Sequence, residues 1–322
     1  MQLRQTASPE RAAQCCAVRV ARRANGPERV AGGDLVIITS TGSVGAVVTG
    51  VQVASATAAQ LATLQQAWYT HDVLICRDQR LTDAELLAFS RHLGEIDPPR
   101  AVASFRNNRS PADYPEIFVV SNRVDEQGHA IGDLGSGEVF WHSDLSYQPD
   151  PPDASMLYAL EIPPAGGDTS FASMKAALAA MPAPLRDRIA GLDLKHDTTR
   201  DACGQLRRGM AMQGPRESPG ATHPLVIEHP VSGAAALYLG RRANAYIPGL
   251  TLAESEALLD ELWSYVETSV YTHRWTVGDL VLWDNRSVMH RRDAFDPRTH
   301  RTMHRTQIKC TTPPRRHPSR SR

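Results

Sequence analysis

The chain has very little lysine and no excess of either charge. Its 322 residues carry 35 basic and 35 acidic side chains, which gives a formal net charge of zero. Only three of the basic residues are lysine, and the other 32 are arginine. A balanced charge gives no global reason to expect nucleic acid or an anionic membrane as a partner. The sequence therefore favours a small-molecule ligand.

Cysteine pairing, long apolar runs and nucleotide-binding glycine motifs are also missing. The five cysteines are scattered and form no C-x-x-C pair, which argues against a disulfide framework and against a cysteine-zinc site. No apolar run approaches the roughly 20 residues of a membrane span. The N-terminus lacks the apolar core of a secretory signal. We therefore expect reduced thiols and a cytoplasmic protein.

Composition changes near both ends of the chain. Residues 1–33 are rich in arginine and alanine and lack sustained periodicity, so we expect a disordered or non-native extension. Residues 34–312 show no internal repeat and predict a single domain. The segment 313–322 is rich in proline, arginine and serine, which predicts a disordered basic tail.

Hydrophobic patterns predict many short strands and a few helices. Capping boxes at Thr82–Glu85 and Thr251–Glu254 predict two helix starts. The expected helices cover 57–68, 82–93, 173–181, 185–189 and 251–266, and the expected strands cover 35–39, 45–53, 73–76, 117–121, 280–283 and 302–309. The absence of β-α-β alternation indicates a mainly β fold, an antiparallel sandwich or jelly roll with helical decoration. Two weakly patterned stretches, 98–138 and 200–222, are candidate lids.

The segment Trp141-His142-Ser143-Asp144 contains the only His-x-Asp or His-x-Glu in the chain. Side chains at i and i+2 of a strand share a face, so His142 and Asp144 can both reach one ion. His290, far downstream, would complete two histidines and one carboxylate, the set that leaves open positions on iron(II). Taken alone, such a triplet is also common among surface residues, and His290 alone fits a core histidine.

Several motifs in a fixed order carry a family resemblance. They are Trp141–Asp144, Pro164-Ala165-Gly166-Gly167-Asp168-Thr169, Trp283-Asp284-Asn285-Arg286 with His290, and Arg301-Thr302-Met303-His304-Arg305. Together they resemble the taurine dioxygenase and phenoxyacetate-herbicide dioxygenase (TauD/TfdA-like) family of iron(II)- and 2-oxoglutarate-dependent enzymes. The resemblance spans about Gly45 to Cys310 and implies a double-stranded β-helix (jelly roll), clavaminate synthase-like, that assembles as a homo-oligomer.

The resemblance implies roles for individual residues. His142, Asp144 and His290 match the iron ligands. Halogenating relatives lack the carboxylate, so Asp144 favours hydroxylation.

A cosubstrate site follows from the same resemblance. Arg301, eleven residues after His290, matches the arginine that binds the far carboxylate of 2-oxoglutarate. Thr169 matches the threonine that bonds the same group, and Arg305 matches a second arginine near the cosubstrate and the substrate's acidic group. A guanidinium is a natural partner for a carboxylate. A pair of solvated surface arginines is the alternative interpretation of Arg301 and Arg305.

The implied reaction uses iron(II), 2-oxoglutarate and dioxygen, releases succinate and carbon dioxide, and hydroxylates a small organic substrate. Arg305 favours an anionic substrate of the sulfonate, carboxylate or aryloxyalkanoate type. Taurine itself is disfavoured, because the histidine and tyrosine of taurine enzymes are absent after Gly94-Glu95. Two other functions stay open at this point, a non-catalytic jelly-roll binding protein with a vestigial site and a metal-dependent hydrolase.

Overall fold

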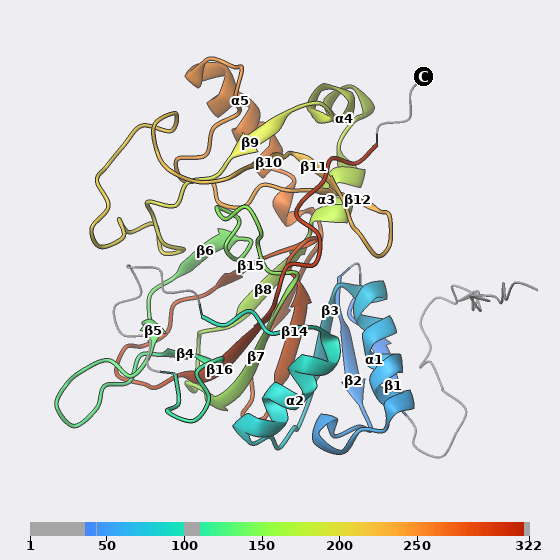
Figure 1. Cartoon of the computed structure of the whole chain (residues 1–322), viewed down its shortest axis with the longest axis vertical. Helices are drawn as coiled ribbons and strands as arrows, with labels where there is room; N and C mark the ends of the chain where they lie inside the picture. The colour runs from blue at the N-terminus through green and yellow to red at the C-terminus, as the bar shows by residue number, and fades with distance from the viewer. Residues whose placement is uncertain (1–35, 43, 100–109, 319–322) are drawn as a thin grey trace, which may run out of the picture.

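The computed structural model describes residues 36–42, 44–99 and 110–318. The predicted extension 1–33 and part of the candidate lid 98–138 lie outside the described residues. Two β-sheets form the centre of the fold, and helices pack around them (Figure 1). None of the helices in the described ranges is both long and apolar enough to cross a membrane.

The larger sheet has eight strands and is mostly antiparallel. Its order is β1 (Ile37–Ser40), β2 (Ala46–Thr49), β3 (Val73–Cys76), β14 (Leu280–Asp284), β7 (Ala154–Glu161), β16 (Thr302–Ile308), β4 (Phe118–Ser121) and β5 (Asp133–Leu134). Strands from distant parts of the sequence therefore lie side by side at its centre. Residues of β7 are buried on both faces along most of the strand, because Met156 and Tyr158 pack in the cluster with the helices while Leu157 and Ala159 pack in the cluster between the sheets.

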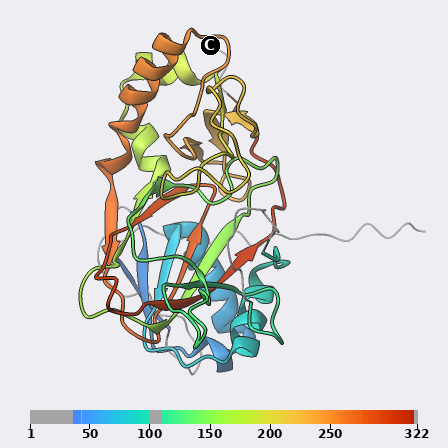
Figure 2. The same cartoon turned by 90° about the vertical axis from the view of Figure 1, so that its left-hand side faces the viewer.

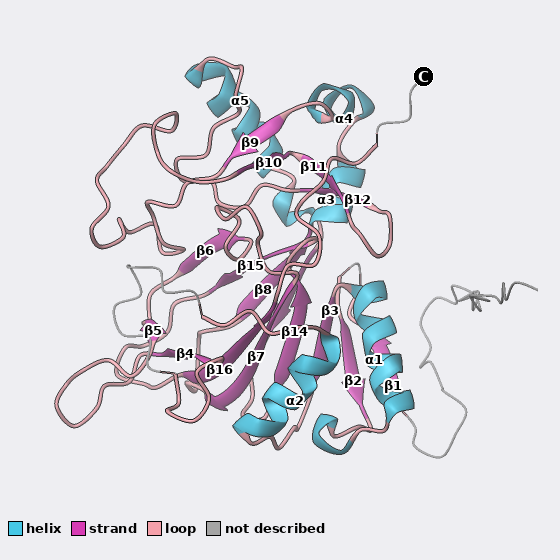
Figure 3. Ribbon diagram, in the orientation of Figure 1, coloured by secondary structure: helices cyan, strands magenta, loops and turns pink. Residues whose placement is uncertain are grey.

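The smaller sheet has four strands and faces the first. Its order is β13 (Val270–His273), β8 (Thr169–Ser173), β15 (Val288–Arg292) and β6 (Val139–His142). Phe171 and Val288 of this sheet share one buried cluster with Trp283 and Met303 of the larger sheet. The two facing sheets confirm the mainly β jelly-roll prediction (Figure 3).

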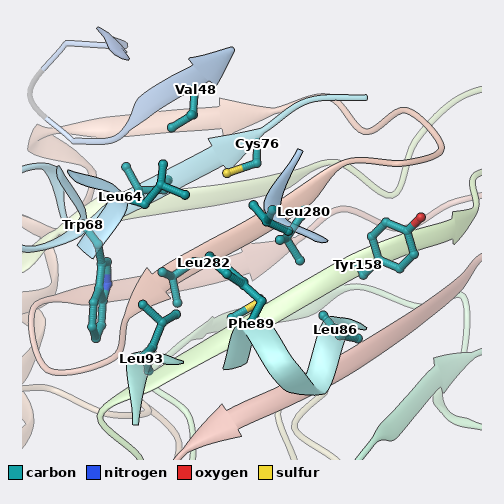
Figure 4. Close-up of a cluster of buried hydrophobic side chains, with 14 of the residues drawn as sticks. Val48, Leu64, Trp68, Cys76, Leu86, Phe89, Leu93, Tyr158, Leu280 and Leu282 are labelled. Atoms are coloured by element: carbon teal, nitrogen blue, oxygen red, sulfur yellow. The ribbon is translucent and has the colours of Figure 1, made fainter. Parts of the chain in front are cut away.

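Helices cover the outer face of the larger sheet. They are α1 (Ala58–His71) and α2 (Asp83–Leu93), with the short 3-10 turn η1 (Val53–Ser55) before them. Leu64, Trp68 and Phe89 pack on sheet residues such as Leu282 (Figure 4). Complete burial of one such side chain contributes about 2 kcal/mol, so this layer holds the sheet in its shape.

A second helical layer lies at one end of the molecule (Figure 2). It contains α3 (Met174–Ala180), α4 (Ala183–Ile189), α5 (Leu252–Trp263), the turn η2 (Val266–Thr268) and two ribbons, β9 (Asp193–Lys195) with β10 (Thr222–Pro224) and β11 (Val226–Glu228) with β12 (Ala235–Leu237). These elements bury a cluster of their own. The layer ends beside β6 and β15, the strands that carry both histidines of the predicted metal site.

Both predicted capping boxes are confirmed. The Thr82 hydroxyl accepts from the Glu85 backbone N–H, and the Glu85 carboxylate accepts from the Thr82 backbone. Thr251 and Glu254 form the same pair at the start of α5.

Three predicted boundaries are wrong. The helix predicted to reach Val266 ends at Trp263, because the Tyr265 N–H bonds to the Leu262 carbonyl and tightens the last turn. The strand predicted for 45–53 ends at Thr49, since the next residue, Gly50, has a φ of 81°.

The boundary of the predicted disordered tail, 313–322, is also wrong, because residues 313–318 lie against β11. The Glu228 N–H bonds to the Arg315 carbonyl and the His317 N–H to the Val226 carbonyl. The Arg316 guanidinium pairs with Asp193.

Candidate metal centre and ligand pockets

Three side chains predicted to meet do so between the two sheets. His142 ends β6 and lies directly opposite His290 on β15. Asp144 follows two residues after His142, and one potential ligand atom from each residue lies within 4.8 Å of the others. All three are buried, with exposures of 5, 4 and 7% for His142, Asp144 and His290. This set can hold one metal ion and is the only such cluster among the described residues.

The prediction was wrong about how Asp144 reaches this position. Strand β6 ends at His142, so Asp144 lies in the following turn rather than on the alternating face of a strand. Asn285 holds this turn: its Oδ1 accepts from the Asp144 backbone N–H at 2.7 Å. Its Nδ2 donates to the Asp144 carbonyl at 2.9 Å. Sequence reasoning quoted the Asp284-Asn285-Arg286 motif without giving Asn285 a role.

The hydrogen bonds of His142 leave one ring nitrogen free for a ligand. Its Nδ1 lies 2.8 Å from the Phe140 carbonyl oxygen, which can only accept, so Nδ1 carries the proton. The Nε2 atom faces Asp144 Oδ1 at 3.6 Å. Burial lowers the pKa of His290 well below its usual range, and the neighbouring His142 lowers it further. Neutral imidazole is the form that binds metals.

Asp144 is held as a carboxylate. Burial by itself would raise its pKa, but the charge of Arg305 holds the pKa well below the usual range. Arg305 Nη1 lies 3.4 Å from Oδ1. The other oxygen, Oδ2, accepts from the Ser155 hydroxyl at 2.7 Å, and Gln307 donates to Ser155 at 2.9 Å. An anionic oxygen therefore faces the histidines in a fixed orientation.

A small pocket adjoins this cluster and contains the three residues predicted to bind a cosubstrate. Thr169, Arg301 and Arg305 all line it, together with His142 and His290. Arg301 is 2% exposed, and its Nε and Nη2 atoms have no hydrogen-bond partner. A buried guanidinium without an anion is costly, so the pocket favours an anionic ligand. Arg301 immediately precedes β16 rather than lying within it.

Two residues that sequence reasoning missed support this pocket. Trp275 donates its indole N–H to the Thr169 hydroxyl oxygen at 2.9 Å, so the hydroxyl proton of Thr169 is free to point into the pocket. Arg292, two residues after His290 on β15, lines the pocket and is 5% exposed. Burial and Arg292 lower the pKa of Arg301 to about 9. The sequence held one signal for Arg292: it lies two residues after His290 on a strand, so the two side chains share a face.

A larger cavity of about 530 Å³ lies on the other side of His142. Its wall combines aromatic, small and charged side chains from β6, from the 197–204 segment, from 241–243 and from α5. The lining includes Phe140, Trp141, Trp263, Ala202, Ala243, Arg200 and Arg241. Cavities of this size bind small organic ligands.

The other histidines of the described residues do not join the metal cluster. His229 lies 2.9 Å from Asp284. His196 and His223 pack against each other and against Tyr238. His304, which the sequence left without a role, pairs with Asp83 at 2.6 Å.

Comparison with known proteins identifies relatives over most of the chain. Residues 37–307 match the family described as taurine catabolism dioxygenase TauD, TfdA family. A relative from Sphingobium herbicidovorans, (S)-phenoxypropionate/alpha-ketoglutarate-dioxygenase, is 34% identical over 276 residues, which is 82% of this chain and 91% of the relative. An alpha-ketoglutarate-dependent 2,4-dichlorophenoxyacetate dioxygenase from Cupriavidus pinatubonensis is 34% identical over 244 residues, 72% of this chain and 83% of that protein.

The fold is also similar to a solved structure. The crystal structure of AAD-2 in complex with Mn(II) and N-oxalylglycine superposes with a TM-score of 0.69 at 26% sequence identity. The match covers 86% of this chain and 98% of the other.

Proposed function

This chain belongs to the taurine catabolism dioxygenase TauD, TfdA family, and from that premise we propose that it hydroxylates a small aryloxyalkanoate. It is an oxidoreductase, a dioxygenase dependent on 2-oxoglutarate, and its cofactors are iron(II), 2-oxoglutarate and dioxygen. Succinate and carbon dioxide are the co-products.

The observation that carries the proposal is the meeting of His142, Asp144 and His290 beside a pocket with an unpaired arginine. In this proposal the three residues hold iron(II), which fits a set of two neutral imidazoles and one carboxylate. Arg301 and Thr169 bind the far carboxylate of 2-oxoglutarate. Arg305 lies at the end of the pocket that faces Asp144.

The protein contributes orientation, charge and exclusion of water. When bound, iron with 2-oxoglutarate and dioxygen supplies the oxidation of a carbon–hydrogen bond. Arg301 fixes the cosubstrate by a bidentate contact, and Trp275 orients the Thr169 hydroxyl toward it. Ser155 and Asn285 hold Asp144, so its carboxylate keeps one orientation. The buried walls of the pocket keep water from the reacting atoms.

The substrate class rests on the larger cavity. Phe140, Trp141 and Trp263 offer aromatic surface to a ring, while arginines in the same wall offer positive charge to an acid. The two relatives described above are named for phenoxypropionate and 2,4-dichlorophenoxyacetate, both aryloxyalkanoates. Sulfonates and simple carboxylates are the other anions that the site would accept.

One assay tests the function and its alternatives. Wild-type protein with 2,4-dichlorophenoxyacetate should form succinate only when iron(II), 2-oxoglutarate and dioxygen are all present. His290→Ala should abolish the product, and the exposed His300→Ala is the matched control that should keep it. Product formation without dioxygen would indicate a metal-dependent hydrolase. Absence of succinate with every acid of a sulfonate, carboxylate and aryloxyalkanoate panel would indicate a binding protein with a vestigial site.

We also propose a cytoplasmic bacterial enzyme that forms a homo-oligomer and binds neither nucleic acid nor membranes. The zero net charge supports the last two points. Light scattering coupled to size-exclusion chromatography tests the assembly, and a monomer at micromolar concentration would contradict it.

A further inference from the structure

Arg241 lies beside the metal centre on the side of the larger cavity. It forms an antiparallel bridge with His142, and the neighbouring Ser143 N–H donates to the Gly240 carbonyl at 3.1 Å. Arg241 also lines the cavity that His142 lines. The backbone of Arg241 therefore pairs with that of a predicted iron ligand, and both residues line the same cavity.

The guanidinium of Arg241 forms no ion pair with any described carboxylate. Its Nη1 donates to the Arg200 carbonyl at 2.9 Å, and its Cζ lies 5.1 Å from the centre of the Tyr147 ring. Its Nε is buried and has no hydrogen-bond partner. The residue therefore lacks an anion in a place where one would stabilise it.

Two other arginines of the cavity wall are already neutralised, and a third donates to a backbone carbonyl. Arg242 pairs with Glu256 and Asp260 at 2.6 Å each. Arg291 pairs with Asp293 at 2.7 Å. Arg200 donates to the Gly204 carbonyl. Arg241 is therefore the arginine of this wall best placed to receive an acid close to His142.

Arg305, the residue first expected to favour an anionic substrate, lies on the other side. It lines the smaller pocket, faces Asp144, and stacks over the Phe118 ring at 4.5 Å. The two arginines thus divide between the two pockets. Arg305 belongs with the cosubstrate and the metal carboxylate, and Arg241 belongs with the substrate cavity.

We propose, on the basis of the function proposed above, that Arg241 binds the carboxylate of an aryloxyalkanoate substrate and determines its specificity for acids. The rest of the substrate then extends along the same cavity toward its open side, where Phe140 is 52% exposed. The carbon between acid and ether oxygen lies near the metal end. A neutral analogue of the same shape lacks the charge-assisted hydrogen bonds.

The test measures binding without turnover. Wild-type protein is loaded with iron(II) and 2-oxoglutarate under anaerobic conditions, and its charge-transfer absorption is followed during titration. The ligands are 2,4-dichlorophenoxyacetate and its uncharged primary amide. The variants are Arg241→Gln, Arg241→Lys and the matched control Arg298→Gln, whose native side chain is exposed, lies outside both pockets and is paired with Asp296.

Wild-type protein should bind the acid at least about 10-fold more tightly than the amide. Arg241→Gln should weaken acid binding by about 10- to 100-fold and remove the preference, with 2-oxoglutarate affinity within about 2-fold of wild type. Arg241→Lys should keep part of the preference, because it keeps the charge but loses the fork. Arg298→Gln should behave as wild type. The charge-transfer band of each variant reports that the metal site is folded.

Two results would overturn the assignment. One is equal affinity of wild-type protein for acid and amide, a measurement that needs no variant. The other is an Arg241→Gln protein that keeps the acid preference or weakens both ligands equally, which indicates a packing role. Failure of the proposed function is distinguished by the succinate assay, in which wild-type protein would form no succinate that depends on iron(II) and dioxygen.

Discussion

Asn285 holds the backbone of Asp144 by two hydrogen bonds, although 141 residues separate them in the sequence. A third bond from Asn285 Nδ2 reaches the Pro152 carbonyl at 3.0 Å. The turn after β14 therefore fixes the turn after β6, and the carboxylate between them depends on both. Side chains that orient ligands in this way change metal affinity without touching the metal.

Asn285→Ala should weaken iron(II) or manganese(II) binding by about 10- to 100-fold, because Asp144 loses its backbone clamp. Equilibrium dialysis of the apo-protein measures the affinity. Asn244→Ala, in a turn with one long bond to the Gln213 carbonyl, is the control and should change affinity by less than about 2-fold. Unchanged affinity in Asn285→Ala would contradict the clamp.

Trp275→Phe should raise the KM for 2-oxoglutarate by about 5-fold and leave the KM for the organic substrate unchanged. The change removes one hydrogen bond to Thr169, worth about 1 kcal/mol, and lets the hydroxyl rotate away from the pocket. Trp68→Phe is the matched control. Its indole N–H is buried without a partner, and its ring packs in the cluster under the helices rather than beside the cosubstrate pocket. An equal rise in both variants would indicate a general loss of packing.

Arg292→Gln should weaken 2-oxoglutarate binding by about 5-fold. Arg292 and Arg301 are two buried cations in one pocket, so a dianion gains attraction from both. Isothermal titration of the manganese-loaded protein in the absence of oxygen measures the affinity. Arg298→Gln removes an exposed arginine and should have no effect. Tighter binding in Arg292→Gln would show that the second cation opposes the site.

Asp284→Asn should destabilise the protein by about 3 to 5 kcal/mol at neutral pH, because buried Arg286 and His229 lose their anion. Urea unfolding measures the change. Burial alone would raise the pKa of Asp284, but Arg286 and His229 outweigh it and hold it below its ordinary value of 3.8.

The difference between wild type and Asp284→Asn is therefore complete above about pH 5. It should shrink as the pH falls through the folded pKa of the carboxyl, when the wild-type group also becomes neutral. An equal difference at pH 3 and pH 7 would exclude an electrostatic cause. The exposed Asp113→Asn is the control and should leave the unfolding midpoint unchanged.

Local signals in the sequence predicted the helices better than the strands. Thr82 and Thr251 mark helix starts because each capping box is complete within four residues. Strand β7 was missed, because its residues are buried on both faces and therefore show no alternation. Its existence depends on β14 and β16, whose pairing cannot be seen in a local window.

The candidate site divides in the same way. His142, Asp144, His290, Thr169, Arg301 and Arg305 were predicted from the family resemblance, and they come together at one cluster and the small pocket beside it. Asn285, Trp275 and Arg241 were missed, because their importance comes from contacts across 99 to 141 positions. No periodicity marks Arg241; only the bridge to His142 brings it to the metal centre.

His142 and His290 lie directly opposite each other, so each of two neighbouring strands carries one of the proposed iron ligands. An ion bound by both strands would join β6 to β15 and would be released when the chain unfolds. A free iron(II) concentration of 100 times the Kd would therefore add about 2.7 kcal/mol to the free energy of unfolding. In an iron-starved cell the empty protein would open more often and reach proteases sooner. Abundance of the enzyme would then follow iron supply without a dedicated regulator.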